Sequence, residues 1–169
     1  VQLGRAMRRA GRFDEAVRTL QQVRDPARRN EALWEIARVR FDQGVFQPAR
    51  AACMAFPSGR MAPPEMVFRN HVCLARAYLV WNRVALAQRE INAVRGSNDA
   101  DGELRLVIAD MHRLAADVQA AETAYQSAAQ ALPGRDEPYL GLGQLYEMAQ
   151  RADDAEAQFR RALSTDESD

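Results

Sequence analysis

Four side chains of the sequence could bind a metal ion or act as nucleophiles, namely Cys53, Cys73, His71 and His112. A structural zinc site needs several such ligands in closely spaced pairs. Only His71 and Cys73 lie close together in the sequence, and no other Cys or His completes a second pair. We therefore expect no metal site. Both histidines are predicted to pack with a polar tip, and Cys53 to be a small buried apolar residue.

Known catalytic motifs are missing from the sequence. It contains no phosphate-binding glycine loop, no dinucleotide fingerprint, no nucleophile elbow and no zinc-protease motif. All 23 residues counted as Lys plus Arg are Arg, so no Lys can form a Schiff base or contact a phosphate. The pairs Asp136-Glu137 and Asp153-Asp154 lie at expected helix starts, where carboxylates complement the helix dipole. The sequence therefore predicts a protein that is not an enzyme and needs no cofactor.

The elements that carry these residues are predicted to be helices. The chain has 169 residues, and Ala, Arg, Gln, Glu and Leu, all good helix formers, are frequent. Apolar residues recur three and four positions apart, and no stretch alternates as a strand would. We therefore predict an all-α fold. No apolar run approaches the length of a membrane span.

The sequence repeats itself. A small residue recurs at gaps of 33, 38, 34 and 34 residues, and a larger side chain usually follows four residues later. These small residues are Ala16, Ala49, Ala87, Ala121 and Ala155. Each unit predicts two amphipathic helices with a short break between them. The breaks fall at Gly11, Gly44, Asn82, Ala116 and Gln150. The longer gap places an insertion at residues 56–65, which is expected to be a surface loop.

The last unit carries a recognisable signature. Its aromatic–Leu–Gly–Tyr–Ala–Phe–Ala pattern consists of Tyr139, Leu142, Gly143, Tyr146, Ala155, Phe159 and Ala162. The other units keep parts of this pattern in register, so the sequence resembles the tetratricopeptide repeat (TPR) family over nearly its whole length. The resemblance implies an α-solenoid of antiparallel helix pairs, about four and a half repeats, in a right-handed superhelix.

The resemblance also implies how the chain is divided. We expect a single array over residues 1–169 and nine helices, the first of them partial. The expected units are approximately 1–29, 30–67, 68–101, 102–135 and 136–169. The first and last residues look like cut ends, which predicts a fragment of a longer protein. Unshielded apolar side chains at Leu3, Met7, Phe159 and Leu163 predict end-to-end contacts between copies.

Charge is distributed unequally along the chain. Residues 1–76 contain 14 Arg and 7 acidic residues, whereas residues 77–169 contain 9 Arg and 16 acidic residues. In a solenoid this asymmetry would become a dipole along the array. Such a dipole would steer a charged partner or order head-to-tail contacts between copies.

In the TPR family the first helix of each unit lines a concave groove, and this implies where a partner would bind. One expected groove column is apolar throughout and consists of Val1, Trp34, Val72, Leu106 and Leu140. A neighbouring column starts with three arginines, Arg5, Arg38 and Arg76, and continues with Asp110 and Gln144. Exposed aromatic residues beside arginines are typical of protein interfaces. The predicted partner-binding residues are Arg5, Arg38, Arg76, Arg69, Trp34, Phe41 and Leu79. The alternative is that Trp34, Phe41 and Leu79 pack between the repeats.

The leading interpretation is a non-enzymatic scaffold or adaptor that binds a protein, peptide or folded domain with an acidic or amphipathic surface. One alternative is an assembly or regulatory domain of a larger enzyme or of an export or secretion machine. A second alternative, an RNA-binding helical repeat, is disfavoured by the acidic second half, so no nucleic-acid partner is expected. Two cysteines used as small apolar residues are typical of a reducing compartment. We therefore expect a cytoplasmic location, with the periplasm as the alternative.

Overall fold

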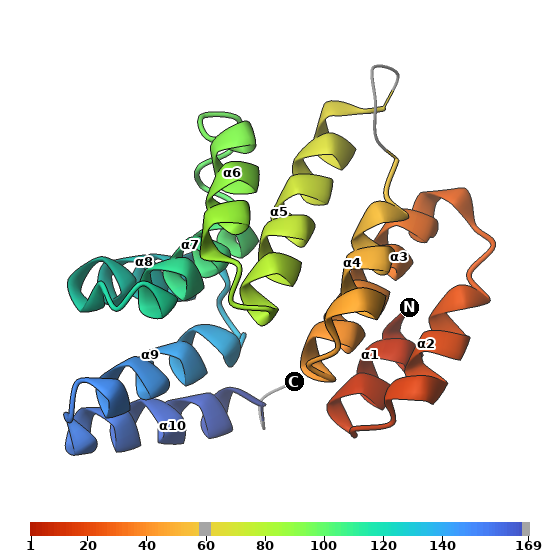
Figure 1. Cartoon of the computed structure of the whole chain (residues 1–169). Coiled ribbons are helices and arrows are strands. Elements are labelled where there is room, and N and C mark those ends of the chain that lie inside the picture. Colours follow the sequence, from red (N-terminus) through yellow and green to blue (C-terminus); the bar gives the residue numbers. More distant parts are fainter. Residues whose placement is uncertain (58–61, 167–169) are drawn as a thin grey trace. The chain divides into compact units, whose positions relative to one another are not determined.

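The computed structural model describes residues 1–57 and 62–166, and this part of the chain is entirely helical (Figure 1). The helices are α1 (Gln2–Arg9), α2 (Phe13–Gln21), α3 (Pro26–Asp42), α4 (Phe46–Met54), α5 (Pro64–Val80), α6 (Val84–Val94), α7 (Gly102–Leu114), α8 (Val118–Ala131), α9 (Glu137–Met148) and α10 (Ala152–Asp166). The all-α prediction is confirmed. The expectation of nine helices is wrong, because the described residues form ten: the first repeat holds a complete pair, α1 and α2.

Consecutive helices form the pairs expected from the repeat pattern: α1 with α2, α3 with α4, α5 with α6, α7 with α8, and α9 with α10. The first helices of the second and third repeats begin at Pro26 and Pro64. Proline suits the first turn of a helix because its missing N–H has no intrahelical acceptor there. Pro26 therefore opens α3 rather than ending α2, whose last residue is Gln21.

The breaks between paired helices share one backbone conformation. Gly11 and Gly44 have φ angles of 71° and 67°, and Asn82, Ala116 and Gln150 have φ angles of 53°, 59° and 58°. This left-handed conformation ends helices and favours glycine. The sequence-based placement of all five breaks is therefore confirmed, although three of the positions hold residues that adopt the conformation at a cost.

Replacing Ala116 by Gly is expected to raise the free energy of unfolding by about 0.5–1 kcal/mol, because Gly removes the strain of a left-handed Ala. The adjacent Ala115→Gly variant is the matched control. Ala115 has a φ angle of −82°, so Gly brings only its entropic cost and lowers stability. Urea unfolding followed by circular dichroism measures both variants. A change of the same sign in the two would contradict this explanation of the turns.

The described chain divides into two compact units, Val1–Ala93 and Val94–Asp169. In unit 1 the recurring small residues Ala16, Ala49 and Ala87 are completely buried. One core cluster joins α2 to α3 through Ala16, Leu20 and Val39. The recurring small residues therefore let neighbouring helices approach closely, as their spacing predicts.

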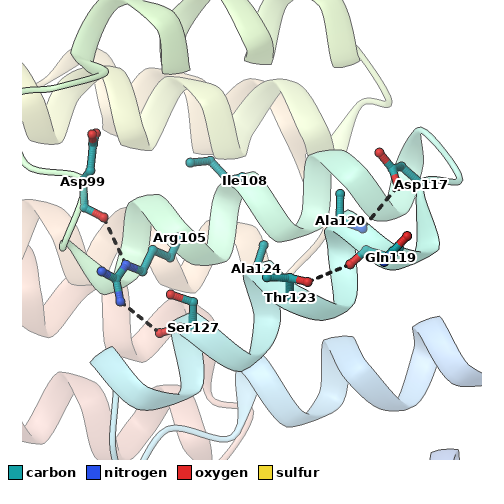
Figure 2. A pocket seen from close by; sticks show the side chains of 9 residues that line it. All are labelled: Asp99, Arg105, Ile108, Asp117, Gln119, Ala120, Thr123, Ala124 and Ser127. Atoms are coloured by element: carbon teal, nitrogen blue, oxygen red, sulfur yellow. Dashed lines mark hydrogen bonds between the residues drawn. The ribbon is translucent and has the colours of Figure 1, made fainter.

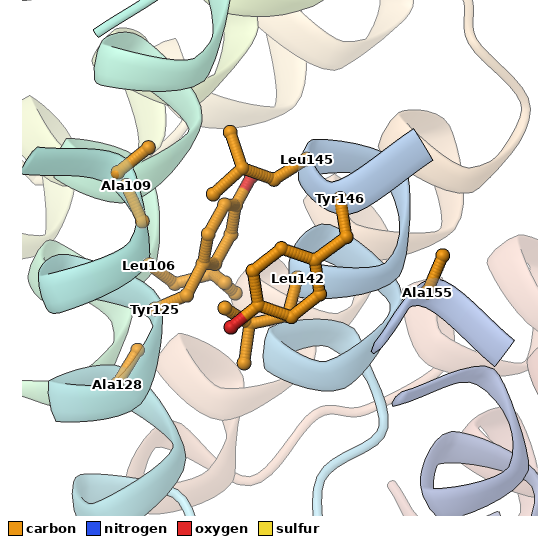
Figure 3. Packing of buried hydrophobic residues seen from close by; sticks show 9 residues of the cluster. Leu106, Ala109, Tyr125, Ala128, Leu142, Leu145, Tyr146 and Ala155 are labelled. Atoms are coloured by element: carbon orange, nitrogen blue, oxygen red, sulfur yellow. The ribbon is translucent and has the colours of Figure 1, made fainter. Parts of the chain in front are cut away.

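Unit 2 is built in the same way. Tyr125 of α8 is completely buried against Leu106 of α7 and Leu142 and Leu145 of α9 (Figure 3). The ring of Tyr125 lies where a β-carbon on Gly141 would be, at 2.2 Å from its Cε1 atom. Close helix packing in this unit therefore depends on glycine as well as on alanine.

A disulfide bond joins Cys53 of α4 to Cys73 of α5, with their Cα atoms 5.4 Å apart. The two cysteines are therefore paired, and the interpretation that they serve only as small apolar residues is wrong. They lie 20 residues apart on different helices, and the packing of α4 against α5 brings them together.

The disulfide spans the expected insertion at residues 56–65. Phe56, at its start, is buried and meets Trp34 edge to face, with ring centroids 6.2 Å apart. The beginning of this segment is therefore part of the core. Residues 58–61 lie outside the described part of the chain.

Candidate functional site

The first helices of the repeats in unit 1, α1, α3 and α5, pack side by side and carry most of the predicted binding residues. We call their outward surface the first-helix face. Trp34, Phe41 and Leu79 are each only 7% exposed. The expectation that these three apolar side chains are exposed is therefore wrong, because all three are buried.

The three arginines expected to form an open row differ in their environment. Arg38 is buried, and its guanidinium lies 3.5 Å from Glu35 of its own helix. Arg5 donates hydrogen bonds to Glu35 at 2.8 Å and to Glu31 at 2.9 Å. Arg5 therefore joins α1 to α3, whereas Arg38 is paired within α3.

The third arginine and its neighbour on α5 are more open. The guanidinium of Arg76 lies 5.1 Å from the centre of the Phe41 ring, a cation–π arrangement. Arg69 is half-buried and pairs with Glu65 at 3.2 Å, one turn earlier on the same helix. Surface ion pairs of this kind contribute little to stability. Arg69 can therefore leave Glu65 and bind a carboxylate of a partner protein at a small cost in free energy.

Glu35 is the residue of this face that the pattern analysis missed. Its side chain is 1% exposed, and Arg8 also lies within 4.0 Å of it. Arg8 donates a further hydrogen bond to Asp42 at the end of α3. The signal was present in the sequence, since Glu31, Glu35 and Arg38 follow one another at spacings of four and three on one helix face.

In unit 2 the first helices are α7 and α9, and the equivalent positions form a different polar cluster. Tyr125 donates a hydrogen bond to Asp110, and Arg113 donates one to the Tyr125 hydroxyl at 2.9 Å. Burial, more than any other cause, raises the pKa of Tyr125 well above its ordinary value. Of the expected apolar column, Leu106 is buried and Leu140 is exposed. This part of the column is therefore not a continuous open surface.

The raised pKa of a second tyrosine in unit 2, Tyr146, leads to an expected dependence of stability on pH. Burial, together with the hydrogen bond that Tyr146 donates to Glu122 at 2.7 Å, raises the pKa of Tyr146 to about 12 from an ordinary value of 10.0. In the unfolded chain the phenol loses its proton near pH 10, while the folded state keeps it. We expect stability to fall as the pH rises from 10 to about 12. Urea unfolding across this range measures the fall, which should be smaller in Tyr146→Phe; equal slopes for the two proteins would contradict it.

Unit 2 also contains an open hollow of about 690 Å³ between α7 and α8 (Figure 2). Arg105 crosses one end of it and donates hydrogen bonds to the carbonyl oxygens of Asp99 and Ser127. At the other end Asp117 caps α8 by accepting from the backbone N–H of Ala120. These polar groups already have partners within the unit, so the hollow resembles a packing gap more than a built ligand site.

The histidines contact carboxylates. His71 Nδ1 lies 2.7 Å from Glu90, and His112 Nδ1 lies 3.6 Å from Asp117. Within the described residues no three Cys, His, Asp or Glu side chains are grouped so that they could hold a metal ion. None of the helices described is long and apolar enough to cross a membrane.

Comparisons with known proteins agree with this architecture. A family model described as a tetratricopeptide repeat matches residues 1–60. A solved structure of a thermophilic TPR protein, TTC0263 of Thermus thermophilus, covers 100% of this chain and 91% of its own, at 22% identity and a TM-score of 0.71. MamA from Desulfovibrio magneticus RS-1 covers 99% of this chain and 93% of its own, at 17% identity and a TM-score of 0.55.

A further MamA crystal structure covers 99% of this chain and 96% of its own, at 19% identity and a TM-score of 0.53. No curated protein matches the chain. At sequence identities below 25%, this structural similarity shows a shared fold and nothing more specific.

Proposed function

We propose that the chain is a non-enzymatic scaffold that binds a partner protein on the first-helix face of unit 1. The proposal is supported by the tetratricopeptide repeat model that matches residues 1–60 and by the fold shared with a solved TPR protein. Solenoid repeats present extended surfaces of this kind to their partners. The observation that carries the proposal is the arrangement on α5, where the half-buried Arg69 and Arg76 lie seven residues apart and Arg76 stacks on the buried Phe41.

The predicted binding residues take two different roles in this proposal. Arg5, Arg69 and Arg76 would contact the partner, since each of these residues is only half-buried. Trp34, Arg38, Phe41 and Leu79 would support the face from below, because each is buried. Substitutions in the second group would test folding rather than binding.

An acidic partner surface fits this face best. Residues 1–93 contain 16 Arg and 8 acidic residues, a net charge of +8. Guanidinium groups bind carboxylates in a defined, often bidentate geometry. Complementary charge would act mainly on the rate of association, which should therefore fall as salt is added. Leu3 and Leu163 are exposed, which also leaves end-to-end self-contacts as part of the proposal.

The disulfide bears on where the scaffold works. Disulfides persist in oxidising compartments and are rare in the cytosol. The Cys53–Cys73 bond therefore favours an oxidising compartment such as the bacterial periplasm over the cytoplasm that the sequence pattern suggested.

Binding is tested by comparing two matched charge reversals. Arg69 and Arg160, whose side chains are 37% and 73% exposed, each pair with a Glu four residues earlier on the same helix. The substitutions Arg69→Glu and Arg160→Glu therefore cost similar, small amounts of stability. We expect Arg69→Glu to weaken partner binding by roughly 1–2 kcal/mol, measured by calorimetry, and Arg160→Glu to leave it unchanged. A loss confined to Arg160→Glu would place the binding surface elsewhere.

A further inference from the structure

A cluster of apolar side chains is exposed at two turns of unit 1, at the ends of the helices rather than along the first-helix face. Trp81, at the end of α5, is 52% exposed and stacks on Phe46, with ring centroids 4.0 Å apart and 18° between the planes. Val45 and Val80 beside them are each 38% exposed. We call these four residues together with Arg83 the turn patch.

The fold itself does not require Trp81 or Val45, whereas Phe46 is buried beneath Trp81. The position that Trp81 occupies before its left-handed turn residue is held in the other repeats by small or polar residues: Ala10, Gln43, Ala115 and Ala149. The position that Val45 occupies after the turn is held by Arg12, Arg83, Asp117 and Arg151. The repeats therefore fold with small or polar residues here, and contiguous exposed apolar side chains at such a place indicate an interaction site.

The charge at the turn patch is positive. The guanidinium of Arg83 lies 5.3 Å from the centre of the Trp81 ring, and no carboxylate of the described chain forms an ion pair with it. Arg50, one helical turn after Phe46 on α4, likewise has no ion pair with any described residue. Asp42, the acidic residue nearest to Val45 in the sequence, is already bonded to Arg8.

We propose that the turn patch binds an acidic peptide segment of a partner protein that carries an aromatic side chain. The aromatic ring would pack on the open side of Trp81, as aromatic pairs do in interfaces. An acidic residue next to it in the peptide would pair with Arg83. A nucleic acid fits less well, because a phosphate backbone needs a row of cations along its path and Val45 and Val80 flank this site.

This surface goes beyond the scaffold function proposed above, and its test uses different residues. The probe is a short synthetic peptide of Asp and Glu with one central Phe. Trp81 reports on its own environment, since the other tryptophan, Trp34, is buried. We expect a saturable change in tryptophan emission on titration. The change should be lost when the Phe of the peptide is replaced by Ala.

Variants test whether the turn patch is responsible for the binding of the peptide. Arg83→Glu should weaken peptide binding by about tenfold or more. Arg89→Glu, an exposed arginine of α6 outside the patch, should leave it unchanged. Trp81→Ala, which creates the residue that three other repeats carry at this position, should fold normally by circular dichroism and lose binding by calorimetry.

Three outcomes would overturn the proposal: no saturable change with the peptide, equal affinity in Arg83→Glu and the parent, or saturable binding of oligothymidylate in place of the peptide. Arg69→Glu should bind the peptide as the parent does, so failure of the turn patch is distinguishable from failure of the first-helix face.

Discussion

Replacing Glu35 by Gln is expected to lower the free energy of unfolding of unit 1 by about 3 kcal/mol. Glu35 is 1% exposed, and three guanidinium groups, those of Arg5, Arg8 and Arg38, lie within 4.0 Å of its carboxylate. Glutamine keeps the shape of the side chain but removes the negative charge. The buried Arg38 and the partly buried Arg5 and Arg8 would then lose their shared buried counter-charge. This loss costs more than the loss of a surface ion pair.

Glu31→Gln is the matched control, because Glu31 lies on the same helix and accepts a hydrogen bond from the same Arg5. Its side chain is 43% exposed, so solvent screens the pair and the expected loss is below about 1 kcal/mol. Urea unfolding followed by tryptophan fluorescence measures both variants, since Trp34 and Trp81 both belong to unit 1. Equal, small losses for the two substitutions would show that Glu35 does not hold α1 to α3.

Removing the disulfide is expected to lower the stability of unit 1 by about 3 kcal/mol. The bond joins residues 20 apart, and closing a loop of this length restricts the unfolded chain by about that amount. Both cysteines are completely buried, so the double substitution Cys53→Ala/Cys73→Ala removes little else than the bond and the two sulfur atoms.

Reduction of the parent protein provides the control for the lost sulfur atoms. Dithiothreitol should shift the urea midpoint of the parent towards that of Cys53→Ala/Cys73→Ala and leave the double variant itself unchanged. A midpoint that is insensitive to reductant in the parent, with thiols that react freely after unfolding, would mean that the bond does not form in solution.

The repeat pattern in the sequence predicts much of the fold. The column of small residues and the turn positions depend on local rules, namely close helix packing and the left-handed end of a helix. Each repeat follows these rules independently of the others. Ala121 is buried, and Ala116 adopts the turn conformation, as the pattern requires. The helix count was too low by one because the first repeat was expected to be incomplete, whereas its two helices, α1 and α2, are both formed.

The binding face was harder to predict, because exposure depends on what the next repeat places on top of a residue. Trp34 occupies a column expected to face the groove, yet Phe56, from the start of the insertion, lies against it. The partner of Arg5 is an acidic residue 30 positions away on another helix. The pairing of Cys53 with Cys73 is likewise a property of two packed helices, which helical periodicity does not encode.

Site-specific cross-linking tests the scaffold account most directly. A photoreactive amino acid at position 69, on the first-helix face, is compared with the same group at position 160, a more exposed helical site on α10. In the cells that make the protein, the account predicts a defined cross-linked partner from position 69 that is absent from position 160. Identical products from both positions, or a product from position 160 alone, would contradict it.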